Sequence, residues 1–257
     1  MLRFAAMGTR VELHVFGDGD PRMLEAARRA IEAVDDALTI HRPSPATALN
    51  EALAGGGTAV VRDPVLLEAL LAIDGCWRAT GELFDPAVGS GGGWGGVAVG
   101  PSGVVTADTP VAFDFGGFGK GFALDRAAAV LRAAGVGCAF LSAGESSVAV
   151  IGEHPLGGGW PVAVPHPLRD GVLVELELRD ASMSVSSTVG NDARSAMIRA
   201  ADGAVVTQPA TAIAVAASGG AAEAMSTALL VAPDDVAGRL TAQAPQDRFR
   251  FTFEGQG

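Results

Sequence analysis

Hydrophobic and polar residues alternate along residues 7–18 (MGTRVELHVFGD), and this period of two predicts a β-strand that ends in a Gly/Asp turn. The hydrophobic residues that follow recur at intervals of three and four, which predicts an amphipathic helix that opens at Pro21. These residues are Leu24, Ala27, Ile31, Val34 and Leu38. Residues 41–50 (HRPSPATALN) carry two prolines within three positions, and we expect them to exclude helix.

A second helix is predicted from the Asp63-Pro64 pair, a cap followed by a first-turn proline, to about Thr80. The stretch 84–100 (FDPAVGSGGGWGGVAVG) is too rich in glycine for regular structure and is predicted to be a loop. Residues 121–134 form a third predicted helix, which ends at Gly135.

The second half of the chain is rich in short hydrophobic runs that favour β-strands. The candidate strands are 138–144, 147–152, 160–167, 172–179, 182–188 and 211–218. Residues 218–235 then predict a helix with Ser218 as a candidate cap. No internal repeat or charged linker divides the sequence, so we predict one α+β domain over residues 1–257, with a large mixed or antiparallel sheet and flanking helices.

Composition excludes some functions. The net charge is −11, and the 18 basic residues are scattered without a basic stripe, which argues against nucleic-acid binding. The first residues, MLRFAAMGTR, lack the apolar run of a signal peptide, and no later stretch is long and apolar enough for a membrane span. We therefore expect a soluble cytoplasmic protein. Cys76 and Cys138 stand far apart, which predicts two buried free thiols rather than a disulfide or a zinc site.

The densest local signal is residues 113–126 (FDFGGFGKGFALDR), where four glycines surround Lys120, the only lysine of the chain. Gly121 follows the lysine where a Walker A motif needs Ser or Thr, and the dinucleotide fingerprint does not fit either. Glycine lets backbone approach a ligand closely, and a lysine at the head of a helix favours an anion. The alternative is a tight strand-to-helix turn with a solvated lysine.

Seven segments of the chain resemble, in the same order and at similar spacing, those of the ApbE family, the FAD:protein FMN transferases. Residues 7–9 resemble the family's "MGT", residues 34–50 its "VDxxxSxxxPxSExxxLN", residues 84–89 its "FDPTVGPL", and residues 113–126 its "LDLGGIAKGYAVDR". Further along, "LSAGESS" (141–147) is similar to "VNAGGDI", "SMSVSSTVG" (182–190) to "SVATSGDY", and "AEAMSTALLV" (222–231) to "ADALATALFV". The resemblance implies an ApbE-like, T-fold-like domain.

The resemblance also implies an activity. The family cleaves FAD at its pyrophosphate and transfers FMN to a Ser or Thr hydroxyl of an acceptor flavoprotein, releasing AMP. Magnesium bridges the pyrophosphate and stabilises the charge of the transition state. The implied ligands are therefore FAD and Mg²⁺, and the implied partner is an acceptor protein.

The family's metal ligands map onto Glu223 and Thr227, with a backbone carbonyl from Ala143 or Gly144. Positions i and i+4 share one helix face, so both oxygens can point at one ion. Glu is one methylene longer than the family's Asp, and the alternative is that Glu223 lies on a solvated face. The resemblance implies an FAD-binding set of Met7, Asn50, Asp85, Asp114, Gly116, Gly117, Lys120, Ala143, Gly144, Glu145 and Thr188. For Asp114, and for Asp125 beside Arg126, anchoring of the turn or of the helix start is the alternative.

The chain departs from the family at its "HxxDPxTG" segment, which corresponds here to residues 196–203 (AMIRAADG). Ala196 stands in the place of the family's His, which acts on the acceptor hydroxyl, so the catalytic base is left unassigned. Arg199 replaces the Asp and is a poor base that suits a phosphate better. Pro45 and Val189 are further departures, in place of a Glu and a Gly.

Glu145 stands where the family has glycine, and it either crowds the flavin or restores a carboxylate lost at the next position. Three hypotheses remain open at this point. The chain is an FMN transferase with a rearranged site, a flavoprotein or oxidoreductase on the same scaffold, or a non-catalytic flavin-binding relative.

Overall fold

The computed structural model describes residues 1–17, 21–87, 90, 92–189, 197–200 and 202–254. Its main element within these residues is a 7-stranded sheet in which every pair of neighbouring strands is antiparallel. In spatial order the strands are β1 (Leu2–Ala6), β2 (Thr9–Val15), β6 (Ala139–Ala143), β7 (Ser147–Ile151), β10 (Ser182–Ser187), β11 (Ala210–Ala216) and β12 (Arg248–Thr252). The prediction of a large antiparallel sheet is therefore confirmed.

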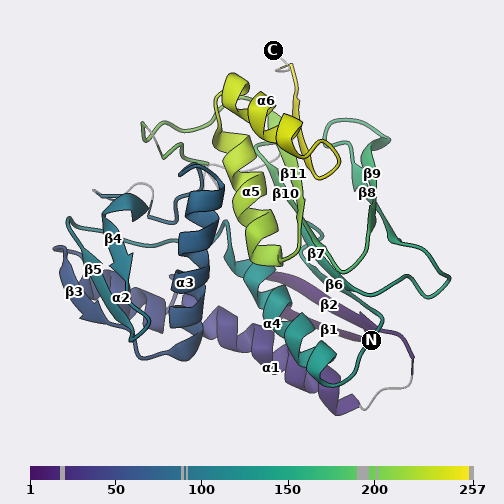
Figure 1. Cartoon of the computed structure of the whole chain (residues 1–257), viewed down its shortest axis with the longest axis horizontal. Coiled ribbons are helices and arrows are strands. Elements are labelled where there is room, and N and C mark those ends of the chain that lie inside the picture. Colours follow the sequence, from purple (N-terminus) through teal and green to yellow (C-terminus); the bar gives the residue numbers. More distant parts are fainter. Residues whose placement is uncertain (18–20, 88–89, 91, 190–196, 201, 255–257) are drawn as a thin grey trace.

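Three helices lie across one face of this sheet (Figure 1). They are α1 (Pro21–Leu38), α4 (Gly119–Ala133) and α5 (Gly219–Val231). Helix α4 packs between the other two, and α5 covers β10 and β11. The largest hydrophobic core lies between these helices and the first strands of the sheet, and it includes Val11, Leu13, Ile31 and Leu131. Burial of such side chains contributes about 1.5–3 kcal/mol each.

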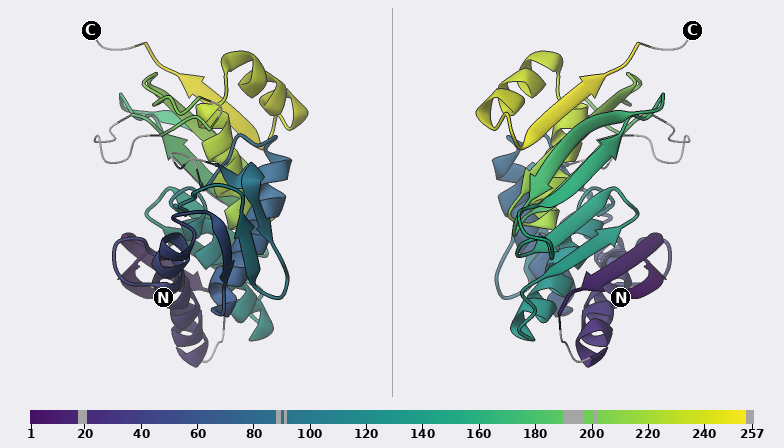
Figure 2. Two further views of the ribbon diagram at one scale, coloured as in Figure 1. Left: turned by 90° about the vertical axis from the view of Figure 1, so that its left-hand side faces the viewer. Right: turned by 90° about the vertical axis from the view of Figure 1, so that its right-hand side faces the viewer.

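The remaining elements flank this core. A second sheet of β3 (Gly57–Val60), β5 (Val104–Ala107) and β4 (Val97–Val99) lies near α2 (Pro45–Ala52) and α3 (Pro64–Ala79). A hairpin of β8 (Trp160–Pro165) and β9 (Val172–Leu178) lies on the opposite side of the molecule (Figure 2). Helix α6 (Asp234–Gln243) precedes the edge strand β12.

The predicted helices at 21–38 and 63–80 and the six predicted strands of the second half are confirmed to within a few residues. Ser218 caps α5 as expected, because its hydroxyl accepts a hydrogen bond from the Ala221 N–H at 3.3 Å. Gly135 ends α4 with a φ of 82°. Helix α4 begins at Gly119, two residues earlier than predicted, so Lys120 lies inside its first turn.

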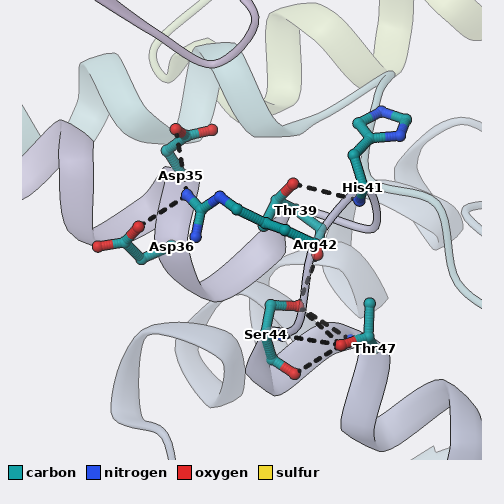
Figure 3. Close-up of polar contacts among 7 residues, drawn as sticks. All are labelled: Asp35, Asp36, Thr39, His41, Arg42, Ser44 and Thr47. Carbon is teal, nitrogen blue, oxygen red and sulfur yellow. Dashed lines mark hydrogen bonds and ion pairs between the residues drawn. The ribbon is translucent and has the colours of Figure 1, made fainter.

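The prediction that residues 41–50 exclude helix is wrong, because α2 begins at Pro45. Proline is tolerated at the first helical position, where its missing N–H has no partner to lose. Ser44 caps the helix in a reciprocal box with Thr47, and the Ser44 hydroxyl also donates to the Thr39 carbonyl at 2.5 Å (Figure 3). Arg42 ties this turn to α1 through Asp36 at 2.7 Å.

The prediction of a loop over 84–100 is also wrong in part. Trp94–Gly96 form a short 3₁₀ turn, and Val97–Val99 form β4. The indole of Trp94 is buried in the core, where it anchors the glycine-rich stretch. The hydrophobic pattern did not reveal β1, β3, β5, α6 or β12.

Cys76 and Cys138 are free, as predicted, but both are half-buried rather than buried. Burial raises the pKa of the Cys76 thiol to about 11, and the nearby Asp125 carboxylate adds to the effect. Within the described part of the chain, no helix combines the length and the apolar character that crossing a bilayer requires.

Candidate functional site

The glycine-rich stretch forms a turn that leads directly into α4. The Asp114 carboxylate accepts a hydrogen bond from the Gly116 N–H at 2.8 Å. Asp114 thus anchors the turn, which was the alternative to a role in FAD binding. Phe118 occupies the cap position without a side-chain cap, and Lys120 follows in the first helical turn. The turn therefore ends at the N-terminus of α4, where the helix dipole favours an anion.

Two glycines bring α4 and α5 into backbone contact. A Cβ atom added at Gly121 would lie 2.1 Å from the Gly219 carbonyl oxygen, and one added at Gly219 would lie 2.4 Å from the Gly121 oxygen. Only glycine allows this approach. The contact places the first turn of α4, with Lys120, against the first turn of α5, which leads into Glu223.

Asp125 of α4 also holds the contact between α4 and α5. Its carboxylate accepts hydrogen bonds from the N–H groups of Gly219 at 2.6 Å and Gly220 at 3.0 Å. Burial raises the pKa of Asp125, while these two hydrogen bonds oppose the rise. We had considered that Asp125 anchors the start of a helix. It does so, but the helix that it anchors is α5 and not α4, in which Asp125 lies.

Lys120 and Glu223 form an ion pair with 3.0 Å between Nζ and Oε1. The Glu223 side chain is only 3% exposed and that of Lys120 is 26% exposed, so the alternatives of a solvated carboxylate and a solvated lysine are both wrong. The Ser147 hydroxyl donates to the same Oε1 atom at 2.6 Å. The second carboxylate oxygen, Oε2, is buried without a hydrogen-bond partner.

Thr227 lies one helical turn after Glu223 and faces the glycine loop. A Cβ atom added at Gly117 would lie 3.0 Å from the Thr227 hydroxyl oxygen and 3.4 Å from the Phe84 ring. Gly117 therefore packs closely against Thr227, and a side chain at this position would have to displace the Thr227 hydroxyl. Ala143 joins the same region, because it pairs with Ser147 across the β6–β7 hairpin.

These residues fit a magnesium ion. The buried, unpartnered Oε2 atom of Glu223 needs a cation or a donor, since an unsatisfied buried carboxylate oxygen is costly. A hydroxyl from Thr227 and a carbonyl from Ala143 would complete a set of hard oxygen ligands, which Mg²⁺ prefers. Among the residues that the structure describes, no three His, Cys, Asp or Glu side chains cluster as metal ligands, so such a site would combine the Glu223 carboxylate with hydroxyl and carbonyl oxygens.

Met7 and Glu145 adopt left-handed backbone conformations, with φ of 55° and 61°. The Met7 methyl group lies close to Gly119, because a Cβ atom added there would be 3.0 Å away. Gly144 precedes Glu145 with a φ of 62° and is packed against Thr9. The Glu145 side chain is 83% exposed and pairs with Arg10 at 2.8 Å, so in this structure the carboxylate points to solvent.

Three other predicted residues have their polar atoms engaged by the protein itself. The Asn50 amide and the backbone of Phe113 exchange two hydrogen bonds of 2.9 and 2.8 Å. The Asp85 carboxylate accepts from the N–H of Ala87 at 2.7 Å and of Trp94 at 3.0 Å. The Thr188 hydroxyl donates to the Gln208 carbonyl at 2.7 Å. These contacts hold the loops around the glycine stretch and the end of β10.

Ala196, at the place of the family's His, lies outside the described residues. The Arg199 guanidinium donates to the Val231 carbonyl at 3.3 Å and to Asp202 at 2.9 Å. Three of the histidines have their contacts elsewhere: His14 with Glu12 and Phe140, His154 with Trp160, and His166 with Phe253.

Sequence reasoning missed two serines that bond Glu223 and two more that bond one of these serines. Besides Ser147, the Ser226 hydroxyl donates to the Glu223 carbonyl at 3.0 Å and lies 3.1 Å from the Ser184 hydroxyl. The Ser186 hydroxyl is 2.8 Å from Ser226 on the other side. The available signal was the presence of hydroxyl residues inside otherwise apolar strand and helix patterns.

The sequence model of the ApbE family matches residues 91–249, which include Lys120, Ser147, Glu223 and Thr227. The chain belongs to the ApbE family. A curated relative, the FAD:protein FMN transferase of Rhodobacter capsulatus, is 33% identical over 213 residues. That match covers 68% of this chain but only 39% of the relative's length.

Solved structures of ApbE proteins share the fold. The apo form of the Pseudomonas stutzeri flavinyl transferase ApbE superposes with a TM-score of 0.84 at 19% identity, covering 100% of this chain and 91% of that one. The flavin transferase ApbE from Vibrio cholerae gives a TM-score of 0.80 at 15% identity and covers 98% and 96% of the two chains. The predicted ApbE-like fold is thus confirmed.

Proposed function

We propose that this ApbE-family chain is an FAD:protein FMN transferase, which moves FMN from FAD to a Ser or Thr hydroxyl of an acceptor protein and releases AMP. The observation that carries the proposal is the arrangement around Glu223, whose carboxylate has one oxygen held by Lys120 and Ser147 and the other buried and free. The curated relative with this activity supports the proposal over the length that it shares with this chain.

Each of the site residues would have a separate role in binding FAD. Lys120 supplies the one lysine charge of the chain at the head of α4, where an anionic pyrophosphate is favoured. Gly116 and Gly117 let the backbone approach the ligand, and Gly117 also makes room for Thr227. Glu223, Thr227 and the Ala143 carbonyl would hold Mg²⁺, which when bound neutralises pyrophosphate charge in the transition state.

In the proposed reaction, the acceptor hydroxyl oxygen forms a bond to the FMN phosphorus. The bond between this phosphorus and the bridging oxygen breaks, and AMP leaves with that oxygen. The hydroxyl proton passes to a base. The other residues of the predicted FAD-binding set are Met7, Asn50, Asp85, Asp114, Gly144, Glu145 and Thr188. Among them, the engaged side chains of Asn50, Asp85, Asp114 and Thr188 would act by holding the surrounding loops.

The proposal extends to the whole chain as one domain over residues 1–257 and to a cytoplasmic location. The free thiols of Cys76 and Cys138 suit a reducing compartment. The acceptor would be a flavoprotein that presents a Ser or Thr side chain.

Transfer can be tested with a panel of Ser- and Thr-containing acceptor peptides, FAD and Mg²⁺. The proposal expects one peptide to gain the mass of FMN less water, with one AMP released for each peptide modified. A matched peptide with Ala at the acceptor position should gain nothing. FAD that binds but yields neither modified peptide nor AMP across the panel would favour the flavoprotein hypothesis instead.

A further inference from the structure

Ser147 is the residue whose relation to Glu223 the sequence did not reveal. It begins β7, is 1% exposed, and reaches across to α5 so that its hydroxyl meets Oε1 of Glu223 at 2.6 Å. A hydrogen bond to a carboxylate of this length belongs to the strong, charge-assisted class. The contact joins residues 76 positions apart in the chain.

The carboxylate of Glu223 is held asymmetrically. Its Oε1 atom receives both the Ser147 hydroxyl and the Lys120 ammonium, whereas Oε2 is buried and receives nothing. Rotation about the last side-chain bond of a glutamate turns the plane of its carboxylate, so without partners the directions of both oxygens are variable. Ser147 removes this freedom because it binds one oxygen and leaves the other with a fixed direction.

We infer that Ser147 is a positioning residue for the metal site: it orients Glu223 so that Oε2, the free oxygen, faces the cation. This inference rests on the proposed function, since it takes the cation to be the Mg²⁺ held by Glu223, Thr227 and the Ala143 carbonyl. The β6–β7 hairpin supports the inference, because Ser147 pairs with Ala143 and therefore fixes Glu223 and Ala143 relative to each other. Outer partners of metal ligands typically contribute 10–100-fold to metal affinity.

The test measures metal binding rather than turnover. Mn²⁺ serves as a paramagnetic substitute for Mg²⁺, and the free Mn²⁺ signal is followed on titration of the full chain with and without FAD. Ser147→Ala is expected to weaken Mn²⁺ binding by roughly 10–100-fold. Ser184→Ala is the matched control: Ser184 is buried in β10 directly opposite Ser147, but its hydroxyl bonds Ser226 and leaves the Glu223 carboxylate untouched. The control should bind Mn²⁺ as the parent chain does.

A double-mutant cycle separates positioning from a general packing effect. Glu223→Asp shortens the side chain by one methylene and withdraws the carboxylate from Ser147. In that background, Ser147→Ala should cost little further affinity. An equal loss in both backgrounds would overturn the inference, because the serine would then act independently of Glu223. Thermal unfolding of each variant shows whether the fold is kept.

The outcomes for the parent chain and for Thr227→Val distinguish the two proposals. Mn²⁺ binding that is lost in Thr227→Val but unchanged in Ser147→Ala would overturn the positioning role alone and leave the metal site standing. Absence of Mn²⁺ binding to the parent chain, with and without FAD, would overturn the metal site and the role of Ser147 together.

Discussion

The ammonium of Lys120 lies 3.0 Å from a carboxylate oxygen of Glu223 that is almost completely buried. The only lysine of the chain thus meets the carboxylate of the candidate metal site. The pair keeps a buried negative charge compensated. The same ammonium lies at the head of α4, where an anionic ligand is favoured.

We expect Lys120→Met to destabilise the protein, because it leaves Glu223 buried and uncompensated. Breaking a buried pair by removing one partner costs about 3–5 kcal/mol, and partial exposure of Lys120 places the expected loss near 3 kcal/mol. Denaturant unfolding at neutral pH measures it. Lys120→Met/Glu223→Gln, which removes both charges, should recover most of the stability. A double variant as unstable as the single one would show that the charge of Glu223 is not the cause.

Gly121→Ala should be strongly destabilising, because the new methyl group would meet the Gly219 carbonyl oxygen. Overpacking of this kind costs typically 1–3 kcal/mol, and a rigid backbone neighbour argues for the upper end. The matched control is Gly238→Ala in α6, where an added Cβ has nothing within 4 Å. The control should stabilise by about 0.5–1 kcal/mol, since alanine favours helix. Equal effects of the two changes in denaturant unfolding would contradict the close contact of α4 and α5.

The raised pKa of Asp125 makes the free energy of unfolding depend on pH in a predictable direction. Its pKa is raised above 3.8 in the folded protein, chiefly by burial, so the folded state binds more protons than the unfolded state above that pH. Its contribution to stability is therefore fully present at acid pH and is lost as pH rises through the folded pKa. The unfolding free energy of the parent chain minus that of Asp125→Asn should fall over this window. A difference that rises with pH would contradict the assignment.

The Cys76 thiol should react slowly with alkylating reagents, because its pKa is raised to about 11 by burial and by Asp125. At pH 8 only about one thousandth of it is thiolate, the reactive form. Alkylation of a Cys138→Ser variant, which leaves Cys76 as the single thiol, should accelerate about tenfold per pH unit from pH 7 to 10. A rate that levels off near pH 8 would mean that the thiol is not buried as described.

Local patterns predicted the parts of the fold that depend on neighbours in sequence. The periodicity of α1, the Asp63 cap of α3 and the Ser218 cap of α5 are signals carried within a few residues. Pro45 was misjudged because a proline can start a helix as well as end one, and the Ser44–Thr47 box decides between the two. The edge strands β1 and β12 are each bonded along one side only, and their short patterns gave no clear signal.

The site itself was predicted only as far as the family resemblance reaches. Glu223 and Thr227 were identified as the positions that match the family's metal ligands, and the structure places both beside the Lys120 turn. The Ser147–Glu223 hydrogen bond joins two elements through tertiary packing, and no pattern along the chain encodes such a contact. The same holds for Asp125, whose partners lie 94 and 95 residues away.

The most direct test of the account is a titration of flavin-stripped protein with FAD, with and without Mg²⁺, followed by flavin fluorescence. The account predicts FAD binding that Mg²⁺ strengthens in the parent chain, with the effect of Mg²⁺ lost in Thr227→Val and binding weakened about 10–100-fold in Lys120→Met, as expected when a charge-assisted hydrogen bond is lost. FAD binding that ignores Mg²⁺ would contradict the metal site at Glu223 and Thr227, and no FAD binding at all would contradict the account as a whole.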